Sequence, residues 1–207
     1  MSVAKRRARE RKQRRELIIQ TAQQLFEEQG FDRTTVEAIA ARAELGKGTI
    51  YSYFQSKEQI YIAILEKGLD LLKERMDQAL QNPASAIDAL HKMFDVFIEY
   101  HQERKDFVET LFVQVDKQNL FKLSGLVGGL KNKASVWVEQ VAKVLAWGIE
   151  RGEFKPVDIF KTAQIIVGMI LGLIMQHETG QTPEAILDYR DTLFQLVLEG
   201  IRVEPVN

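Results

Sequence analysis

Apolar residues recur at intervals of three and four positions along almost the whole chain, and strand-like alternation of apolar and polar residues is scarce. This recurrence matches the 3.6-residue turn of an α-helix. Only four prolines interrupt the 207 residues, so the sequence permits long helices. We therefore predict an all-α fold of about nine helices.

The N-terminal part of the pattern predicts four helices of unequal length. The first ends at Gly30, a residue suited to a helix C-terminus. The second is capped by Thr34 or Thr35, whose hydroxyl can accept a hydrogen bond from a free backbone N–H. A third, short helix follows a turn at Glu44 and Leu45, and a long fourth helix comes next. The expected long helices run over about 11–29, 59–80, 84–102, 104–118, 122–150, 157–178 and 184–201.

Two short helices joined by a tight turn form a helix-turn-helix, whose second helix enters the major groove of DNA. Here that helix contains Gly48, which costs roughly 1 kcal/mol relative to alanine but lets another backbone approach closely. The alternative is a small three-helix core with half-buried tyrosines, but it does not explain a glycine between a lysine and a threonine. We predict DNA contacts from the cations, hydroxyls and glycine of this region: Lys47, Gly48, Thr49, Tyr51, Ser52, Tyr53 and Lys57.

Charge is distributed unevenly along the chain, although the net charge is −1. Residues 1–58 carry 12 Lys and Arg against 8 Asp and Glu, whereas residues 59–207 carry 16 against 21. Eight of the cations lie within the first 15 residues, where Glu10 is the one acid. The basic N-terminus is either a surface for a polyanion or a disordered, solubilising tail, and both readings stay open.

The stretch "TAQQLFEEQGFDRTTVEAIAARAELGKGTIYSYFQSKEQIYIAIL" resembles the DNA-binding domain of the TetR family of bacterial transcriptional regulators. The motifs "LFEEQGF", "TTVEAIA", "GKGTIYSYF" and "SKEQI" follow the family's order and spacing over about residues 18–65. The resemblance implies a DNA-binding domain over residues 1–58, joined by a long helix to a ligand-binding and dimerisation domain over residues 59–207. It also implies phosphate contacts from Thr34 and Thr35, and a basic tail that lies along the DNA backbone or in the minor groove.

Two residues depart from the family's pattern. Glu44 stands in the turn where many members have glycine, and a positive φ would strain it mildly. Gly46 stands where many members have a serine cap, and glycine is a moderate cap. Neither change removes an expected DNA contact.

Family members act as two-fold dimers on near-palindromic operators, so the resemblance implies a homodimer and double-stranded operator DNA. The helix expected over 157–178 supports a dimer, because it is apolar nearly all round and has Gly168 and Gly172 four positions apart. The amphipathic helix expected over 184–201 would complete the interface. Alternatively, the apolar helix is central in its own core. Its most apolar run, 163–176, is shorter than the about 20 residues that span a membrane, so we predict a buried helix and no membrane association.

The resemblance further implies a cavity in the second domain, where a small molecule would bind and release the DNA. A ligand there would tilt the fourth helix and change the spacing between the two recognition helices. The region is rich in aromatic residues and methionines, which suit a hydrophobic or flat aromatic effector. Ordinary core packing is the alternative for each of them. The candidate ligand contacts are Phe97, Phe112, Trp137 and Met169.

Composition argues against other functions. The chain has no cysteine, which excludes disulfides and thiolate chemistry and fits a cytoplasmic protein. It has no glycine-rich phosphate loop and no nucleophile–base grouping, so we predict no enzyme activity. His91, His101 and His177 lack metal-ligand spacing, and we predict no metal and no cofactor. The remaining rivals are a DNA-binding protein without an inducer, such as a nucleoid or division factor, and an activator.

Overall fold

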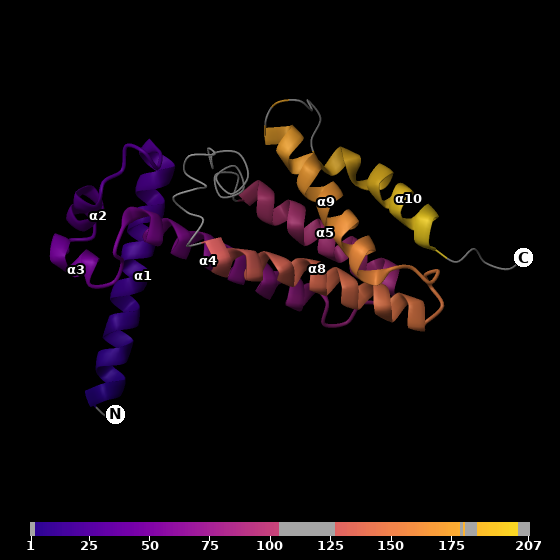
Figure 1. Ribbon diagram of the computed structural model, residues 1–207, viewed down its shortest axis with the longest axis horizontal. Coiled ribbons are helices and arrows are strands. Elements are labelled where there is room, and N and C mark those ends of the chain that lie inside the picture. Colours follow the sequence, from indigo (N-terminus) through magenta and orange to yellow (C-terminus); the bar gives the residue numbers. More distant parts are fainter. Residues whose placement is uncertain (1–2, 104–126, 179, 181–185, 203–207) are drawn as a thin grey trace, which may run out of the picture. The chain divides into compact units, whose positions relative to one another are not determined.

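The computed structural model describes residues 3–103, 127–178, 180 and 186–202; within 127–178 it describes the side chains of residues 135–177. Over these residues the fold is all-α (Figure 1), as the sequence predicted. The expected helix over 104–118 and the candidate ligand contact Phe112 lie outside the described residues.

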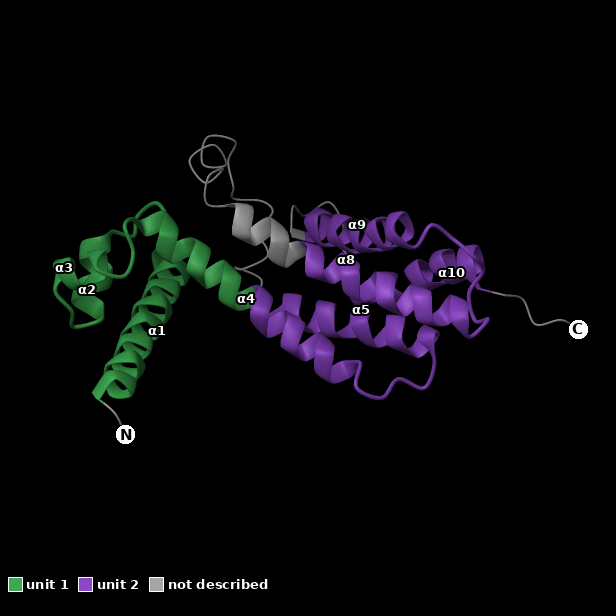
Figure 2. Ribbon diagram, turned by 60° about the horizontal axis from the view of Figure 1, so that its bottom comes forward, with its two compact units in different colours: residues 1–68, 122–130 green, residues 69–121, 131–207 purple. Residues whose placement is uncertain are grey.

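The chain divides into two compact units, coloured separately in Figure 2. Unit 1 comprises residues 1–68 and 122–130, and unit 2 comprises residues 69–121 and 131–207. The division falls inside the long fourth helix, whereas the sequence placed the domain boundary at its start. The helices are α1 (Val3–Gln29), α2 (Val36–Arg42), α3 (Lys47–Tyr51), α4 (Lys57–Ala79), α5 (Ala86–Glu103), α8 (Val127–Glu150), α9 (Ile159–Glu178), the 3-10 helix η1 (Ile186–Tyr189) and α10 (Arg190–Ile201).

Unit 1 has its own apolar core, to which α1, α2, α3 and the first part of α4 contribute. The guanidinium of Arg42 donates two hydrogen bonds to the carboxylate of Glu28, at 2.9 and 2.8 Å, and so joins α2 to the end of α1. Burial of the branched side chains supplies most of the driving force for this packing. The core residues include Ile18, Ile19, Ala22 and Leu25 of α1, Ile39 of α2, Ile50 of α3, and Ile60 and Ile64 of α4.

Four local features of unit 1, all at helix ends and turns, agree with the predictions from the sequence. Gly30 ends α1 with a φ of 83°, and Thr35 caps α2 by accepting a hydrogen bond from the N–H of Ala38 at 3.1 Å. Glu44 has a φ of 54°, which is the mild strain expected of a non-glycine residue in this turn. Gly46 caps α3 without a side-chain hydrogen bond.

The first helix is longer than expected. It begins at Val3 instead of about residue 11, so the basic N-terminus is helical and not a disordered tail. The inward face of its second half begins at Ile18, which is fully buried, whereas Leu17 is 42% exposed.

Unit 2 packs α5, α8, α9 and α10 around a second apolar core. Arg190 at the start of α10 forms a bidentate ion pair with Asp95 of α5, at 2.7 and 3.0 Å. At the other end of α10, the N–H of Lys155 donates to the carbonyl of Ile201 at 2.6 Å. The last helix is therefore fixed at both ends by residues distant in the sequence.

The apolar helix α9 is less buried than the sequence predicted. Its residues Ile159–His177 are long and apolar enough to cross a membrane by length and composition alone, and 17% of that stretch is buried. One side of the helix packs into unit 2 through Ala163, Ile166, Ile170 and Ile174. The other side of α9 has nothing packed on it in the described part of this single chain, so the alternative of a helix central in its own core is wrong. Burial of that side in a homodimer stays a prediction.

Candidate nucleic-acid interface and ligand cavity

The short helix α3 has one buried side and one exposed side. Ile50 is fully buried in the core of unit 1, whereas Tyr51 is 45% exposed. Lys47, Gly48 and Ser52 are exposed as well. These residues are the ones that the sequence assigned to DNA, and a helix held by a single buried anchor leaves the rest of its surface for a groove.

Gly48 has no structural reason within the protein. A Cβ atom built on it would meet nothing within 4 Å, so the fold tolerates alanine, which favours a helix by about 1 kcal/mol. The same is not true of Gly148 in unit 2, whose Cβ would collide with a buried ring. The packing of unit 1 therefore does not require glycine at position 48, and its expected close approach to DNA stays a prediction.

Lys47 does not project freely. Its ammonium group forms an ion pair with the carboxylate of Glu37 on α2 and lies 5.8 Å from the ring centroid of Tyr51. The hydrogen bond from Lys47 lowers the pKa of Glu37, and the same bond raises the pKa of Lys47. Both side chains are exposed, so a phosphate can compete with Glu37 for the cation.

The three remaining residues around the end of α3 have mixed roles. The Ser52 hydroxyl donates to the carbonyl of Thr49 at 2.7 Å and so closes the last turn of the helix. Tyr53 is half-buried against the core of unit 1, and the guanidinium of Arg11 lies 5.8 Å from its ring centroid. Thr49 is half-buried. Contacts from these side chains to DNA remain predictions.

Thr34 has a different role from the expected phosphate contact. It is 1% exposed, and its hydroxyl lies 2.8 Å from the carbonyl oxygen of Gly30 and 3.3 Å from that of Leu25. A side chain that is buried and hydrogen-bonded at the end of α1 cannot reach a phosphate without opening the fold. Thr35, in contrast, is exposed and stays a predicted contact.

Lys57 is likewise used inside the fold. Its ammonium donates to the carbonyls of Phe31 at 2.6 Å and Thr34 at 2.9 Å, with that of Asp32 at 3.4 Å. The ammonium also lies 4.2 Å from the ring centroid of Phe31. These contacts tie the loop between α1 and α2 to the start of α4, so we assign Lys57 a structural role in place of the expected phosphate contact.

Replacing Lys57 by methionine should lower the free energy of unfolding of unit 1 by about 2 kcal/mol, because hydrogen bonds to a charged group contribute about 1.5–3 kcal/mol each. Far-UV circular dichroism during thermal and urea unfolding measures this loss. Both tryptophans of the chain lie on α8, so tryptophan emission follows unit 2 separately and should not change. Lys67→Met is the matched control, because Lys67 forms an exposed pair with Glu16, which contributes at most about 1 kcal/mol. Equal losses in the two variants would contradict the structural role of Lys57.

Unit 2 contains an apolar cavity of about 30 Å³. Two of the four candidate ligand contacts meet in its wall, since the rings of Phe97 and Trp137 lie 4.4 Å apart and perpendicular to each other. Met169 is not part of the wall. The lining residues are Met76, Leu90, Met93, Phe94, Phe97, Trp137, Val141, Ile166, Val167, Ile170, Leu193, Phe194 and Val197.

The indole N–H of Trp137 is buried without a hydrogen-bond partner among the residues that the structure describes. A buried donor without an acceptor is costly. An apolar wall with one such donor suits a ligand that carries an apolar body and a hydrogen-bond acceptor.

The spacing of the histidines in the sequence did not predict two ring contacts around this core. The ring of His91 stacks on Phe194 with centroids 3.7 Å apart, and burial, followed by the charge of Arg190, lowers the pKa of His91. The rings of His101 on α5 and His177 on α9 lie 6.4 Å apart. No cluster of three or more His, Cys, Asp or Glu side chains that could hold a metal ion occurs in the described ranges.

Comparison with known proteins agrees with the helix-turn-helix. The family described as "Bacterial regulatory proteins, tetR family" matches residues 18–64. The HTH-type transcriptional repressor KstR2 of Mycobacterium tuberculosis is 30% identical over 149 residues, which cover 69% of this chain and 70% of the relative.

Solved structures match over nearly the full length. The fatty acid degradation regulator FadR from Bacillus halodurans has a TM-score of 0.76 at 19% identity and covers 90% of this chain and 95% of its own. FadR from Bacillus subtilis, solved in complex with stearoyl-CoA, has a TM-score of 0.75 at 22% identity; the match covers 90% of this chain and 98% of FadR. The helix-turn-helix matches the family's DNA-binding domain, and a repressor of 30% identity covers more than two thirds of the chain. The chain therefore belongs to the tetR family of bacterial transcriptional regulators.

Proposed function

We propose that the protein is a cytoplasmic repressor that binds a near-palindromic operator as a homodimer and leaves it when a small hydrophobic ligand enters unit 2. The observation that carries the DNA-binding part is the exposed side of α3, with Gly48 open to close approach beside Lys47 and Tyr51. Two recognition helices related by a two-fold axis would read half-sites about 34–36 Å apart.

The outer side of the last two helices supports a dimer. Large apolar side chains are exposed there, including Ile165 at 63% and Leu196 at 61%. On α9 they lie beside Gly168 and Gly172, neither of which has an atom within 4 Å of a built Cβ, so a second helix can approach closely. We call this surface the α9–α10 face; its large exposed residues are Phe160, Ile165, Met175, Leu187 and Leu196.

The cavity supports a ligand of limited polarity. B. subtilis FadR was solved with stearoyl-CoA, and the solved structure of KstR2 is described as a ketosteroid regulator; a fatty acyl chain or a fused ring would suit the same apolar walls. A cavity of about 30 Å³ holds little more than a water molecule, so a ligand must push the walls apart. Met76 of α4 is one of those walls, and α4 begins at Lys57 in unit 1. Ligand binding would therefore act on the helix that both units share, and favour a state with lower affinity for DNA.

The small volume favours one second candidate, a DNA-binding protein of this family without an inducer. A closed core would then be the working state of unit 2, and DNA binding would not respond to hydrophobic compounds.

The DNA-binding part is tested by selecting bound duplexes from a random pool. The selected duplexes, and DNA from upstream of the gene, are then footprinted across a salt series. A protected near-palindrome is expected, and the slope of log K against log salt should rise by about 0.9 for each phosphate neutralised. Gly48→Ala should lower operator affinity about tenfold, or about 1.4 kcal/mol, without lowering the stability of unit 1. No protection by the folded wild-type protein at low salt would refute the proposal.

The ligand part is tested by adding stearoyl-CoA, or a ketosteroid, to the protein–operator complex. Release of DNA together with a change in the emission of Trp137, absent in a Trp137→Phe variant, is the expected result. Unchanged operator affinity with both compounds and with a wider panel of hydrophobic compounds would favour the candidate without an inducer.

A further inference from the structure

Unit 2 has a second hollow besides the cavity described above. It is an open groove of about 380 Å³ between the end of α4, the start of α5 and the second half of α8. We call it the α8 groove. Among the described residues, none lines both the α8 groove and the cavity. Small-molecule sites have volumes of about 300–1,000 Å³, so the α8 groove has room for a ligand without a movement of its walls.

Most of the α8 groove is apolar. Trp147 supplies its largest side chain, which is half-buried, and the guanidinium of Arg151 lies 5.2 Å from the centroid of the indole ring. A cation over an aromatic face is favourable and helps to hold the ring in place. An aromatic group of a ligand would pack on this surface. The apolar residues of the α8 groove are Leu80, Pro83, Ala89, Val144 and Trp147.

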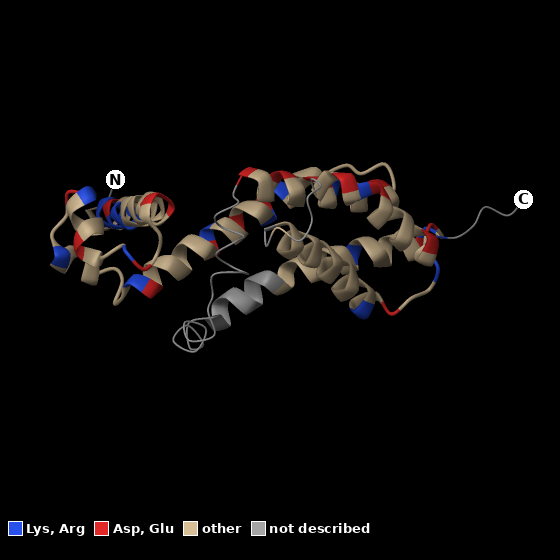
Figure 3. Cartoon of the chain, turned by 90° about the horizontal axis from the view of Figure 1, so that it is seen from above, with Lys and Arg blue, Asp and Glu red and all other residues tan. Residues whose placement is uncertain are grey.

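Lys143 gives the α8 groove a positive charge. Figure 3 shows both signs of charge along the helices of unit 2, and most of its described Lys and Arg side chains pair with a carboxylate. The pairs join Lys73 to Asp77, Arg75 to Glu103, Lys92 to Asp88, Arg151 to Glu153, Lys161 to Asp158 and Arg190 to Asp95. Lys143 is exposed and forms no such pair with a described residue, although Glu139 precedes it by about one turn of α8. Its charge is therefore available to an anion from solution.

Gln140 places a buried hydrogen-bond acceptor without a donor in the wall of the α8 groove. The side chain is 7% exposed, and its Nε2 donates to Oδ1 of Asp77 at 2.7 Å. Because a carboxylate only accepts hydrogen bonds, the amide nitrogen must face Asp77, which fixes the orientation of the amide. The amide oxygen Oε1 is buried and accepts no hydrogen bond from the residues that the structure describes. Such an acceptor costs about 1–3 kcal/mol, and a donor on a molecule bound against Gln140 would remove that cost.

Gln140, Lys143 and Trp147 follow one another along one side of α8. They are three and four positions apart, which makes them neighbours on the helix surface, and the rise from the first to the last is about 10 Å. The carboxylate of Asp77 on α4 is already compensated, because Lys73 pairs with one of its oxygens and Gln140 donates to the other. An anion in the α8 groove would therefore be drawn to Lys143.

We propose that the α8 groove binds a small aromatic 2-hydroxycarboxylate. The carboxylate pairs with the ammonium of Lys143, the hydroxyl donates to Oε1 of Gln140, and the ring packs on Trp147. A hydroxyl next to the carboxylate suits this arrangement, because Gln140 and Lys143 are about one helical turn apart. The site lies outside the cavity that receives the DNA-releasing ligand in the proposed function, so this inference does not depend on that function.

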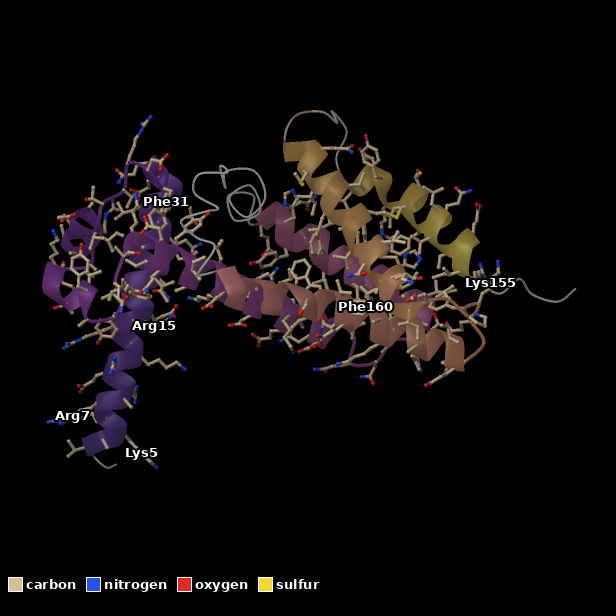
Figure 4. The ribbon with its side chains drawn as sticks, in the orientation of Figure 1. Lys5, Arg7, Arg15, Phe31, Lys155 and Phe160 are labelled. Atoms are coloured by element: carbon tan, nitrogen blue, oxygen red, sulfur yellow. The ribbon has the colours of Figure 1, made fainter. Side chains whose placement is uncertain are left out.

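The test is isothermal titration calorimetry of the full-length protein with 3-phenyllactate, in the absence of DNA. The analogues 3-phenylpropanoate, which lacks the hydroxyl, and 3-phenyllactamide, which lacks the charge, should each bind about tenfold more weakly. Lys143→Gln should lower the affinity for 3-phenyllactate about tenfold, and Lys143→Arg, which keeps the charge, should lower it less than about threefold. Lys155→Gln is the matched control and should leave the affinity unchanged. Lys155 is exposed, does not line the α8 groove and lies beside the end of α10 (Figure 4).

The two tryptophans of the chain distinguish the α8 groove from the cavity, because Trp147 lines the first and Trp137 lines the second. Trp137→Phe leaves Trp147 as the only tryptophan, and its emission should change as 3-phenyllactate saturates the protein. Trp147→Phe leaves Trp137, whose emission should stay the same. Far-UV circular dichroism checks that both variants are folded.

Loss of affinity in Lys143→Gln but not in Lys155→Gln, together with a response from Trp147, would support the inference. It would be overturned by the absence of saturable binding of 3-phenyllactate to the folded wild-type protein. Equal affinities of the Lys143→Gln and Lys155→Gln variants, or an emission change from Trp137 alone, would also overturn it. Because no DNA is present in these measurements, each of these results leaves operator binding to its own test.

Discussion

Replacing Ile165 by glutamate is expected to convert the proposed homodimer into monomers. Ile165 lies at the centre of the outer side of α9, 63% exposed in the single chain and close to Gly168 and Gly172. In a two-fold interface each substitution appears twice, so two carboxylates would enter the same apolar contact without a partner. Burying an unpaired charge costs several kcal/mol, and we expect the dimer dissociation constant to rise at least about 100-fold.

Sedimentation velocity over a range of protein concentrations measures this change. Gln78→Glu is the control, because it adds the same charge to an exposed position on α4, away from the α9–α10 face. The monomeric variant should still fold, and should bind one half-site with much lower affinity than the dimer binds two. A variant that remains dimeric would show that the face has another use, and binding of the wild-type protein to lipid vesicles would then identify α9 as a membrane contact.

Replacing Gly148 by alanine should strongly destabilise unit 2. A Cβ at this position of α8 would lie 2.2 and 2.4 Å from two ring carbons of Phe154 and 2.8 Å from the Cβ of Ala86. Phe154 is 1% exposed, and the N–H groups of Glu153 and Phe154 both donate to the carbonyl of Gly148, at 2.8 and 3.1 Å. Neither the ring nor the backbone can move away, so the overpacking should cost about 3 kcal/mol.

Urea unfolding followed by tryptophan emission reports this loss, since both tryptophans lie on α8 of unit 2. Gly200→Ala is the control at equal protein concentration, because a Cβ there meets nothing within 4 Å and alanine is the better helix former. Its stability should stay the same or rise by less than about 1 kcal/mol. A Gly148→Ala variant as stable as the control would mean that the α8–α9 turn repacks freely.

Local signals were sufficient to predict the helix order, caps and turn of the helix-turn-helix in unit 1. The apolar period, the cap at Thr35, the stop at Gly30 and the positive φ of Glu44 all depend on neighbouring residues, and the sequence contains them within a few positions. Thr34 and Thr35 could not be separated in this way. Both hydroxyls are suited to a cap or a phosphate, and only the packing of Thr34 against the end of α1 decides between them.

Long-range contacts explain the remaining errors. Lys57 lies 26 positions from Phe31, whose carbonyl it binds, so its sequence neighbours gave no sign of that role. The cavity wall combines residues of α4, α5, α8, α9 and α10. The richness of this region in aromatic residues and methionines could not show that Trp137 lines the cavity whereas Met169 does not. The sequence left two places open for α9, because apolarity on all sides of a helix has the same signature in a core and in a subunit interface.

The way α10 is fixed determines the order in which the parts of a newly made chain can fold. The core of unit 1 uses residues 18–64 alone, whereas unit 2 depends on contacts such as that between Arg190 and Asp95, 95 positions apart, and that between Lys155 and Ile201. N-terminal domains fold first during synthesis, which proceeds at about 5–20 residues per second. The helix-turn-helix can therefore fold roughly 7–30 seconds before α10 is complete, at the same rate of synthesis. A growing chain therefore has α3 in place well before the α9–α10 face is made, and if that face pairs two copies as proposed, a dimer that holds two recognition helices would form only after α10 has joined unit 2.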